Sequence, residues 1–273
     1  MSQPIVAANS SAAYFDQDLL DRGHLAVTCD GAVATVSLNR PAALNAQLPT
    51  TWEALAHIGS RLPGDTRVVI VCGEGSSFSA GLDRAAFGSA PGSLLSMLAG
   101  APESVADATI AGFQRGFSWL SDPRFISIAA VAGHAIGAGF QLALACDLIV
   151  AADDAQFRMA EVSLGIVPDL GGTGRLIRLV GYQRALEICA TGRHVHADEA
   201  VRIGLALVSV PLAELDAAVA DLAAAVVESP APAVRAVKQL IAVAHDNTAD
   251  EQLAAERAAQ VPLLVALAHA AGL

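Results

Sequence analysis

The sequence is nearly free of lysine: Lys238 is the only one, and the formal net charge is −11 at pH 7. Binding to a nucleic-acid backbone depends on basic residues that neutralise its phosphates, and the composition provides no such basic face. A mechanism built on an imine needs a reactive lysine amine, for which the chain has a single candidate. The composition therefore disfavours both nucleic-acid binding and lysine-based Schiff-base chemistry.

Cysteine is also scarce, and its spacing does not suggest a disulfide framework. The chain has four cysteines, far apart and mostly inside apolar runs: Cys29, Cys72, Cys146 and Cys189. We interpret them as buried free thiols in a reducing compartment. Residues 1–22 lack the basic start and the apolar segment of a secretory signal, so we expect a cytoplasmic protein. No cysteine or carboxylate cluster accompanies His194 and His196, so we expect no metal site.

Apolar residues, by contrast, are abundant: 54% of the chain is hydrophobic and the mean hydropathy is +0.50. An isolated monomer does not need so much apolar surface, and burial between subunits is its natural outlet. The stretch 129–152 is long and apolar enough to imitate a membrane span, but His134, Gln141, Asp147 and a glycine cluster fit a span poorly. We expect a buried strand, loop, helix and strand there, and no membrane association.

Residues 128–169 contain the candidate chemistry. The apolar run 128–132 is stopped by the glycines of 133–139, and apolar residues at helical spacing follow through Cys146. This pattern is typical of a strand, a tight loop and a helix. The first N–H groups of a helix have no partner within it, so they can hold an anion or a carbonyl oxygen that becomes one. Because the acids Glu161 and Asp169 follow these donors, the stretch indicates chemistry on an enolate.

The preceding chain shows the same alternation of strand, loop and helix. Two strands, 25–29 and 33–38, flank Asp30-Gly31, which is the signal of a tight hairpin. The apolar run 68–72 predicts a strand buried on both faces, followed by a loop of small residues and a short helix near 84–87. Successive ββα turns would bring this loop and the glycine loop after residue 132 to the same edge.

We expect three regions along the chain. Residues 1–22, rich in Ala, Ser, Gln and Asp, predict a flexible N-terminal tail, and residues 23–205 predict an α/β core. Within the core, residues 88–103 are rich in Gly, Ser, Pro and Ala and predict a mobile connection. From residue 206 onward, helices with broad Ala, Leu and Val faces predict an oligomerisation region over 206–273.

Four motifs occur in a fixed order: Asn39-Arg-Pro41 with Asn45, Phe78-Ser-Ala-Gly81-Leu-Asp83, Gly133 to Cys146-Asp147, and Glu161 to Gly172. Together they resemble the enoyl-CoA hydratase/isomerase (crotonase) superfamily, over about residues 25–270. The resemblance implies a crotonase-like spiral of ββα units with a C-terminal helical trimerisation region, and so a homotrimer or a dimer of trimers. It also implies that the core binds an acyl-CoA thioester, with coenzyme A as part of the substrate and no separate cofactor.

Carried over residue by residue, the resemblance makes the backbone N–H groups of Leu82 and Ala138 an oxyanion hole. It places three side chains beside the acyl chain as catalytic positions, namely Gln141, Glu161 and Asp169. The substrate-binding residues that it implies are Ala43, Ala80, Leu82, Asp83, Arg84, Gly137 and Ala138. A thioester carbonyl polarised by two N–H groups has an acidic neighbouring C–H. Burial of Glu161 among apolar residues would raise its pKa and make it a stronger base.

Gln141 departs from the hydratase pattern, in which a second glutamate stands at this position. An amide can hold a water or orient Glu161, but it cannot exchange protons near neutral pH. The family's isomerases need one acid at the position of Glu161, and its dienoyl isomerases carry an aspartate at that of Asp169. We therefore favour double-bond isomerisation of an enoyl- or dienoyl-CoA, with Glu161 as base. Hydration of a 2-enoyl-CoA is one alternative, and a non-catalytic acyl-CoA-binding protein is another.

Structural interpretations also exist for several of these residues. Asp169 precedes Gly171 and Gly172 and is equally suited to be a helix N-cap. Arg84 either contacts the CoA phosphates or is simply solvated. The glycines of 133–139 do not have the spacing of a dinucleotide-binding loop, which disfavours a nucleotide cofactor.

Overall fold

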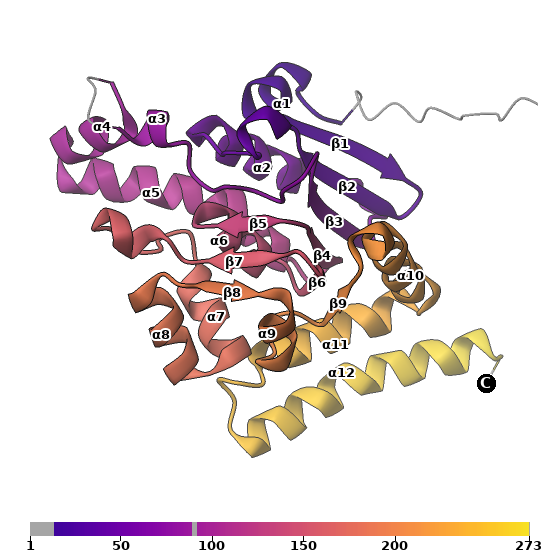
Figure 1. The fold of residues 1–273 in the computed structure, drawn as a ribbon. Helices are drawn as coiled ribbons and strands as arrows, with labels where there is room; N and C mark the ends of the chain where they lie inside the picture. The colour runs from indigo at the N-terminus through magenta and orange to yellow at the C-terminus, as the bar shows by residue number, and fades with distance from the viewer. Residues whose placement is uncertain (1–13, 89–91, 273) are drawn as a thin grey trace, which may run out of the picture.

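The computed structural model describes residues 14–88 and 92–272, which form two β-sheets and the helices that cover them (Figure 1). The larger sheet has six strands in the order β1-β2-β3-β4-β6-β9, and the smaller has three in the order β5-β7-β8. The strands are β1 (Leu25–Asp30), β2 (Val33–Leu38), β3 (Val68–Gly73), β4 (Ile126–Val131), β5 (His134–Ile136), β6 (Leu148–Ala152), β7 (Gln156–Arg158), β8 (His194–His196) and β9 (Val208–Val210).

Helices follow or separate most strands. The α-helices are α1 (Gln17–Gly23), α2 (Pro49–Arg61), α3 (Arg84–Phe87), α4 (Leu94–Gly100), α5 (Glu103–Ser118), α6 (Ala138–Ala145), α7 (Gly172–Val180), α8 (Tyr182–Thr191), α9 (Ala197–Arg202), α10 (Leu215–Glu228), α11 (Ala231–Val243) and α12 (Ala249–Ala270). Short 3-10 helices are η2 (Pro41–Ala43), η3 (Trp119–Ser121), η4 (Glu161–Leu164) and η5 (Leu212–Glu214).

The large sheet begins with the predicted hairpin and continues as parallel strands. β1 and β2 pair antiparallel across Asp30 and Gly31, and Gly31 takes the left-handed φ of +54° that the tight turn requires. β2, β3, β4, β6 and β9 then pair in parallel. β4, α6 and β6 confirm the prediction that the apolar stretch 129–152 is a buried strand, loop, helix and strand, and β3 confirms the strand predicted at 68–72.

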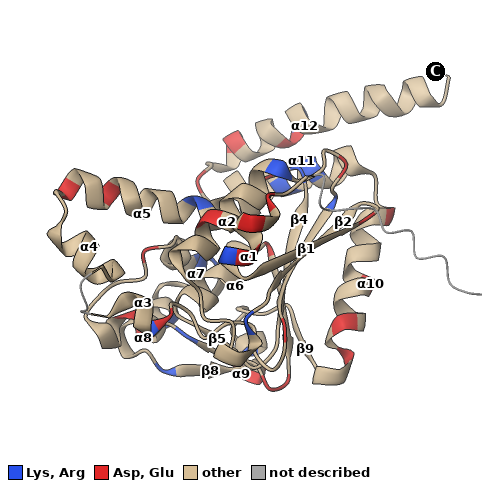
Figure 2. Ribbon diagram, turned by 90° about the horizontal axis from the view of Figure 1, so that it is seen from above, with Lys and Arg blue, Asp and Glu red and all other residues tan. Residues whose placement is uncertain are grey.

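Both faces of the central strands are buried, which explains their uninterrupted apolar sequences. Along β4, Ala129 and Val131 belong to the main core, whereas Ile128 and Ala130 belong to a second core. This alternation is the two-residue period of a strand. Figure 2 shows α10 on the second-core side of the sheet and α1, α2 and α6 on the other side. The mixed α/β class that the sequence predicted is confirmed.

Two segments are more ordered than the sequence indicated. The prediction of a flexible tail over residues 1–22 is wrong at the C-terminal end of that range. There α1 is capped by the Asp16 side chain and buries Leu19 and Leu20 against the main core. Residues 1–13 of that tail lie outside the described residues. In the predicted mobile connection 88–103, α4 forms after its cap Ser93 and buries Leu94. In both places a polar cap and a few buried apolar residues fix a helix that composition alone does not reveal.

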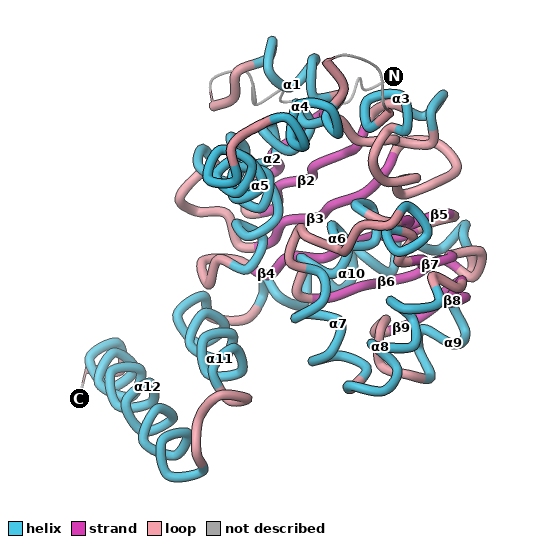
Figure 3. Tube along the Cα trace, turned by 90° about the vertical axis from the view of Figure 1, so that its left-hand side faces the viewer, coloured by secondary structure: helices cyan, strands magenta, loops and turns pink. Residues whose placement is uncertain are grey.

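The C-terminal helices α11 and α12 lie apart from the two sheets (Figure 3). Neither contains a buried residue within the chain, and several of their large apolar side chains, such as Ile241 and Leu267, are exposed. Over residues 14–88 and 92–272, no single helix is long and apolar enough to cross a membrane. The segments Leu212–Glu228 and Ala231–Val243 pass that test by composition only as a pair, bent by 108°.

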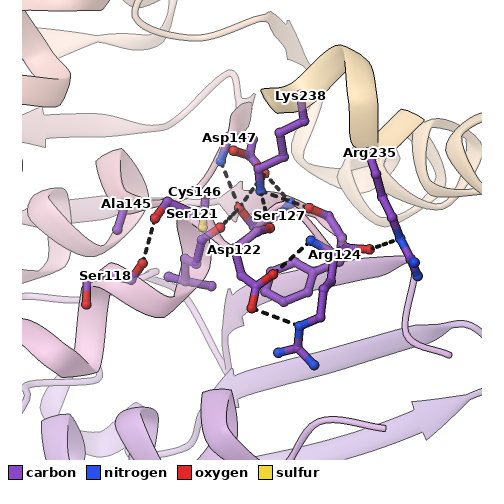
Figure 4. A network of polar contacts seen from close by, with 12 residues as sticks. Ser118, Ser121, Asp122, Arg124, Ser127, Ala145, Cys146, Asp147, Arg235 and Lys238 are labelled. Atoms are coloured by element: carbon purple, nitrogen blue, oxygen red, sulfur yellow. Dashed lines mark hydrogen bonds and ion pairs between the residues drawn. The ribbon is translucent and has the colours of Figure 1, made fainter. Parts of the chain in front are cut away.

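The single lysine attaches α11 to the core (Figure 4). Lys238 Nζ donates to the carbonyl oxygens of Asp122 and Phe125 at 2.7 and 2.8 Å and forms an ion pair with Asp147 Oδ2 at 2.7 Å. The same Asp147 oxygen accepts from the backbone N–H and the hydroxyl of Ser127. Because the Lys238 amine is fully engaged and nearly buried, it serves as an anchor for the C-terminal helices.

Candidate active site

The glycine loop after residue 132, which we call the first loop, ends at a helix N-terminus, as the sequence predicted. α6 begins at Ala138, and its N-cap Gly137 has φ +53° and ψ −119°, a conformation that favours glycine. The Gly137 N–H donates to the Arg158 carbonyl of β7, which fixes the loop against the small sheet. Ala138 is the first helical residue, so its N–H has no acceptor in the helix and is free to bind a ligand oxygen.

The second loop, which contains Gly81 and Leu82, lies directly against the first. Gly81 has φ +84°, and a Cβ placed on it would collide with the Ile136 carbonyl and lie 3.3 Å from the Ala138 nitrogen. Leu82 follows Gly81 in a short parallel bridge to Gln47. Among the residues that the structure describes, neither the Leu82 nor the Ala138 N–H donates a hydrogen bond. The structure therefore brings together the two backbone donors that the sequence singled out.

Glu161 lies beside these donors at the start of η4 and is 7% exposed. A Cβ on Gly137 would be 3.4 Å from Glu161 Oε1, so the carboxylate borders the first loop. Within the described part of the chain, Glu161 Oε2 is the one buried side-chain oxygen or nitrogen without a hydrogen-bond partner. Burial raises the pKa of Glu161, and the charge of Asp169 raises it further. An unpartnered carboxylate oxygen with raised proton affinity is suited to take up a proton from a ligand.

Gln141 holds the other oxygen of this carboxylate. Its Nε2 donates to Glu161 Oε1 at 2.7 Å, and its Oε1 accepts from the N–H groups of Leu170 and Gly172 at 2.9 and 3.3 Å. Since two backbone donors face Oε1, the orientation of the amide is fixed and the NH₂ group must face Glu161. Gln141 thus positions Glu161 and the loop that carries Asp169.

Asp169 is half-buried on the loop before α7. Burial raises the pKa of its carboxyl group. The interpretation of Asp169 as a helix cap is wrong, because the N-cap of α7 is Gly171 and no side chain caps that helix. Its side chain is free to act on a ligand, while its backbone carbonyl accepts from Gln114 Nε2 at 2.7 Å.

The residues expected to bind substrate fall into two groups. Leu82, Gly137 and Ala138 belong to the two loops. Ala80 lies two residues before Leu82, and its N–H donates to the Leu44 carbonyl, next to Ala43. Asp83 is instead a structural residue: it caps α3 and forms an ion pair with Arg40 at 2.6 Å, and the Arg40 guanidinium lowers the pKa of Asp83.

Arg84 is exposed at the first position of α3 and forms no ion pair within residues 14–88 and 92–272. Its position agrees equally with binding a phosphate and with simple solvation. The two histidines on β8, His194 and His196, are exposed, and no group of three or more potential metal ligands occurs in the described ranges.

Sequence reasoning missed two buried polar residues behind the donor loops, Gln47 and Ser79. Both are fully buried and hydrogen-bonded to each other at 3.0 Å. A glutamine between Ala46 and Leu48 has no distinctive pattern, whereas Ser79 stands inside a motif that the sequence had already marked. Their role depends on a contact between segments 32 residues apart in the chain.

Known proteins with the same arrangement belong to one family. The family model described as enoyl-CoA hydratase/isomerase matches residues 28–265. A Mycobacterium bovis protein assigned as an enoyl-CoA hydratase is 34% identical over 230 residues, covering 84% of each chain. The short-chain-enoyl-CoA hydratase of Clostridium acetobutylicum is 37% identical over 197 residues, covering 68% of each chain.

Solved structures show the same similarity in three dimensions. A Thermobifida fusca protein assigned as an enoyl-CoA hydratase, in complex with CoA, superposes with a TM-score of 0.87 at 44% identity. The match covers 94% of this chain and 98% of that one. A second complex from that organism, with acetoacetyl-CoA, gives a TM-score of 0.87 at 43% identity, with 92% and 99% of the two chains covered.

Proposed function

Because this chain belongs to the enoyl-CoA hydratase/isomerase (crotonase) superfamily and is an enzyme of that family, we propose that it adds water to the double bond of a 2-enoyl-CoA, or removes it in the reverse direction. The names of the relatives support this reaction, the alternative in the sequence-based hypothesis, more than the isomerisation that we favoured from Gln141. The observation that carries the proposal is the position of Glu161, whose unpartnered carboxylate oxygen lies beside the loop that leads to the Ala138 donor, with the charge of Asp169 near enough to raise its pKa.

The N–H groups of Leu82 and Ala138 would bind the thioester oxygen. When negative charge develops on that oxygen, the two donors already point at it and need no rearrangement. Each such donor typically contributes about 3 kcal/mol of transition-state stabilisation. The start of α6 adds the positive end of a helix dipole at Ala138. These groups account for the formation of an enolate without a metal ion.

The two acids would move the protons. Glu161 Oε2 takes a proton from water as the water oxygen bonds to C3, and the electron pair of the double bond shifts to the thioester oxygen. Asp169, whose pKa is raised by burial, would donate a proton to C2. Proton exchange with solvent then restores both groups. In this scheme Gln141 positions Glu161 and transfers no proton.

Isomerisation of a 3-enoyl- or 3,5-dienoyl-CoA is the second candidate. One observation favours it: the position next to Glu161 holds Gln141, which bonds to Glu161, Leu170 and Gly172, and an amide cannot serve as the second acid. The same pair, Glu161 and Asp169, can remove a proton from one carbon and return one to another. The two candidates therefore share the enolate and differ in whether water enters the product.

A substrate panel separates the candidates. We would measure the turnover of matched 2-enoyl-, 3-enoyl- and 3,5-dienoyl-CoA thioesters over a series of chain lengths, with free CoA as a competitor. Hydration predicts the highest kcat/KM on a 2-enoyl-CoA. Turnover confined to the 3-enoyl or dienoyl thioesters would favour isomerisation instead.

We also propose that the protein assembles as a homotrimer or a dimer of trimers. Support comes from the apolar side chains of α11 and α12, including Val237, Ile241, Leu264 and Leu267, which are exposed in the single chain. An apolar surface of this kind is stabilised by burial against another subunit. Analytical ultracentrifugation at micromolar concentration provides the test, and a stable monomer would contradict this proposal.

A further inference from the structure

Ser79 lies between the two donor loops and is completely buried. Its backbone pairs with β5 like a short strand: its N–H donates to the His134 carbonyl at 2.7 Å, and its carbonyl accepts from the Ile136 N–H at 2.9 Å. Ile136 immediately precedes Gly137 and Ala138. The backbone of Ser79 therefore fixes the strand that leads into the first donor.

The hydroxyl of Ser79 fixes the second loop. It donates to the Asn45 carbonyl at 2.8 Å and accepts from Gln47 Nε2 at 3.0 Å and from the Gly81 N–H at 3.2 Å. One donor and two acceptor sites are all that a hydroxyl has, so Ser79 is fully used. Gly81 is the residue before the second donor, Leu82.

Gln47 holds the same loop from the opposite side. Its Oε1 accepts from the indole N–H of Trp52 at 2.7 Å, so its Nε2 must face Ser79. Its backbone N–H donates to the Gly81 carbonyl at 2.7 Å, and its carbonyl accepts from the Asp83 N–H at 2.8 Å. The peptide that carries the Leu82 N–H is thereby fixed on both sides.

The first turn of α6 also rests on Ser79. A Cβ placed on Gly139 would lie 2.5 Å from the Ser79 carbonyl oxygen and 2.7 Å from its Cβ. Ser79 thus contacts the strand before one donor, the helix that carries that donor and the residue before the other donor.

We propose that Ser79, supported by Gln47, is a positioning residue that sets the relative placement of the Leu82 and Ala138 N–H groups. The inference rests on the proposed function, because it concerns donors for a thioester oxygen. Removing the hydroxyl would leave the Gly81 N–H and Gln47 Nε2 without an acceptor in a buried site. The Gly81–Leu82 peptide would then turn to find another partner, and small displacements of catalytic donors reduce rates strongly.

The test compares Ser79→Ala with Ser37→Ala. Ser37 is also buried, but its hydroxyl contacts Cys72 Sγ on β3, away from the donor loops. For each protein we would measure kcat and KM on the best enoyl thioester and the dissociation constant of CoA. Difference absorbance would give the fraction of bound acetoacetyl-CoA present as its enolate, because two N–H groups aimed at the thioester oxygen stabilise that form.

We expect kcat of Ser79→Ala to fall roughly tenfold to a hundredfold, and the enolate fraction to fall with it. CoA affinity should change by less than about twofold, since the loss concerns the charged oxygen only. Ser37→Ala should keep the wild-type enolate fraction. Gln47→Leu leaves Ser79 in place and should shift the enolate fraction in the same direction, which provides a second variant if Ser79→Ala does not fold.

Equal enolate fractions in wild type, Ser79→Ala and Gln47→Leu would overturn the inference while leaving the proposed function intact. In that outcome the wild type would still turn over enoyl thioesters. A wild-type protein that neither turns over enoyl thioesters nor stabilises the enolate would overturn the proposed function, and this inference with it.

Discussion

The amide of Gln141 donates to Oε1 of Glu161 at 2.7 Å, and this contact leaves only Oε2 of that carboxylate for a ligand. The direction of the bond is fixed, because the opposite end of the amide accepts from the backbone at Leu170 and Gly172. A residue that could have been a second acid is instead part of the support for the first. In the proposed mechanism the chemistry therefore depends on Glu161 and Asp169.

Gln141→Glu should shift the acid limb of the pH–rate profile. Its carboxylate would face Glu161 Oε1 at close range, and two carboxylates so near share one proton, which raises one pKa strongly. We expect the pH at which kcat/KM reaches half its maximum to rise by about one unit or more. Gln141→Leu removes the hydrogen bond without adding charge and should lower kcat without that shift. An unchanged acid limb in Gln141→Glu would contradict the geometry described for the pair.

Glu161→Gln should stabilise the fold at neutral pH. Burial raises the pKa of folded Glu161 above its usual value of 4.5, so the folded state retains a proton that the unfolded state has lost. Stability contributed by this group is therefore lost as pH rises from the unfolded to the folded pKa, and it stays lost above. We expect a higher Tm for Glu161→Gln at pH 7 and no difference below the unfolded pKa. The exposed Glu256→Gln on α12 is the matched control and should show neither effect.

Asp169→Asn should abolish most of the activity without weakening the fold. A lost general acid typically costs about a hundredfold or more in kcat. Because Asp169 does not cap α7 and burial raises its pKa, the Tm at pH 7 should be at least as high as that of Asp107→Asn, an exposed control on α5. A clear loss of Tm with full activity per folded molecule would return Asp169 to a structural role. Unequal losses on 2-enoyl and 3,5-dienoyl thioesters would show which reaction needs this acid most.

Ala138→Gly and Ala138→Pro differ in whether residue 138 keeps its backbone N–H group. Glycine keeps the backbone N–H and should retain activity, whereas proline deletes it and should lower kcat by about 10²–10³. Proline is tolerated at the first position of a helix, which Ala138 occupies, so we expect the fold to survive. Circular dichroism would establish that it does. An inactive but folded glycine variant would show that the methyl group, and not the N–H, is required.

Sequence reasoning predicted the parts of this protein that are specified locally. The hairpin around Gly31, the apolar strands buried on both faces and the glycine loop before Ala138 each follow from residue type and spacing within a few positions. α1 and α4 were missed because a few buried side chains, such as Leu20 and Leu94, determine them.

The site residues that belong to recognisable motifs were predicted, whereas the roles that depend on tertiary contacts were missed. Glu161, Leu82 and Ala138 were identified from the sequence, and the structure brings them together. The direction of the Gln141 amide and the roles of Gln47 and Ser79 were not visible, because each depends on backbone groups from distant segments. Asp169 was left open between acid and cap, and the observed start of α7 excludes the cap.

The central claim is that Glu161 activates a water that adds to a 2-enoyl-CoA. Its most direct test is turnover in ¹⁸O-labelled water, followed by mass spectrometry of the acyl-CoA product, for wild type and Glu161→Gln. The account predicts one labelled oxygen in the wild-type product, and a loss of labelled product of about a hundredfold or more in Glu161→Gln with nearly unchanged CoA affinity. Unlabelled, isomerised product from the wild type, or labelled product at the wild-type rate from Glu161→Gln, would contradict it.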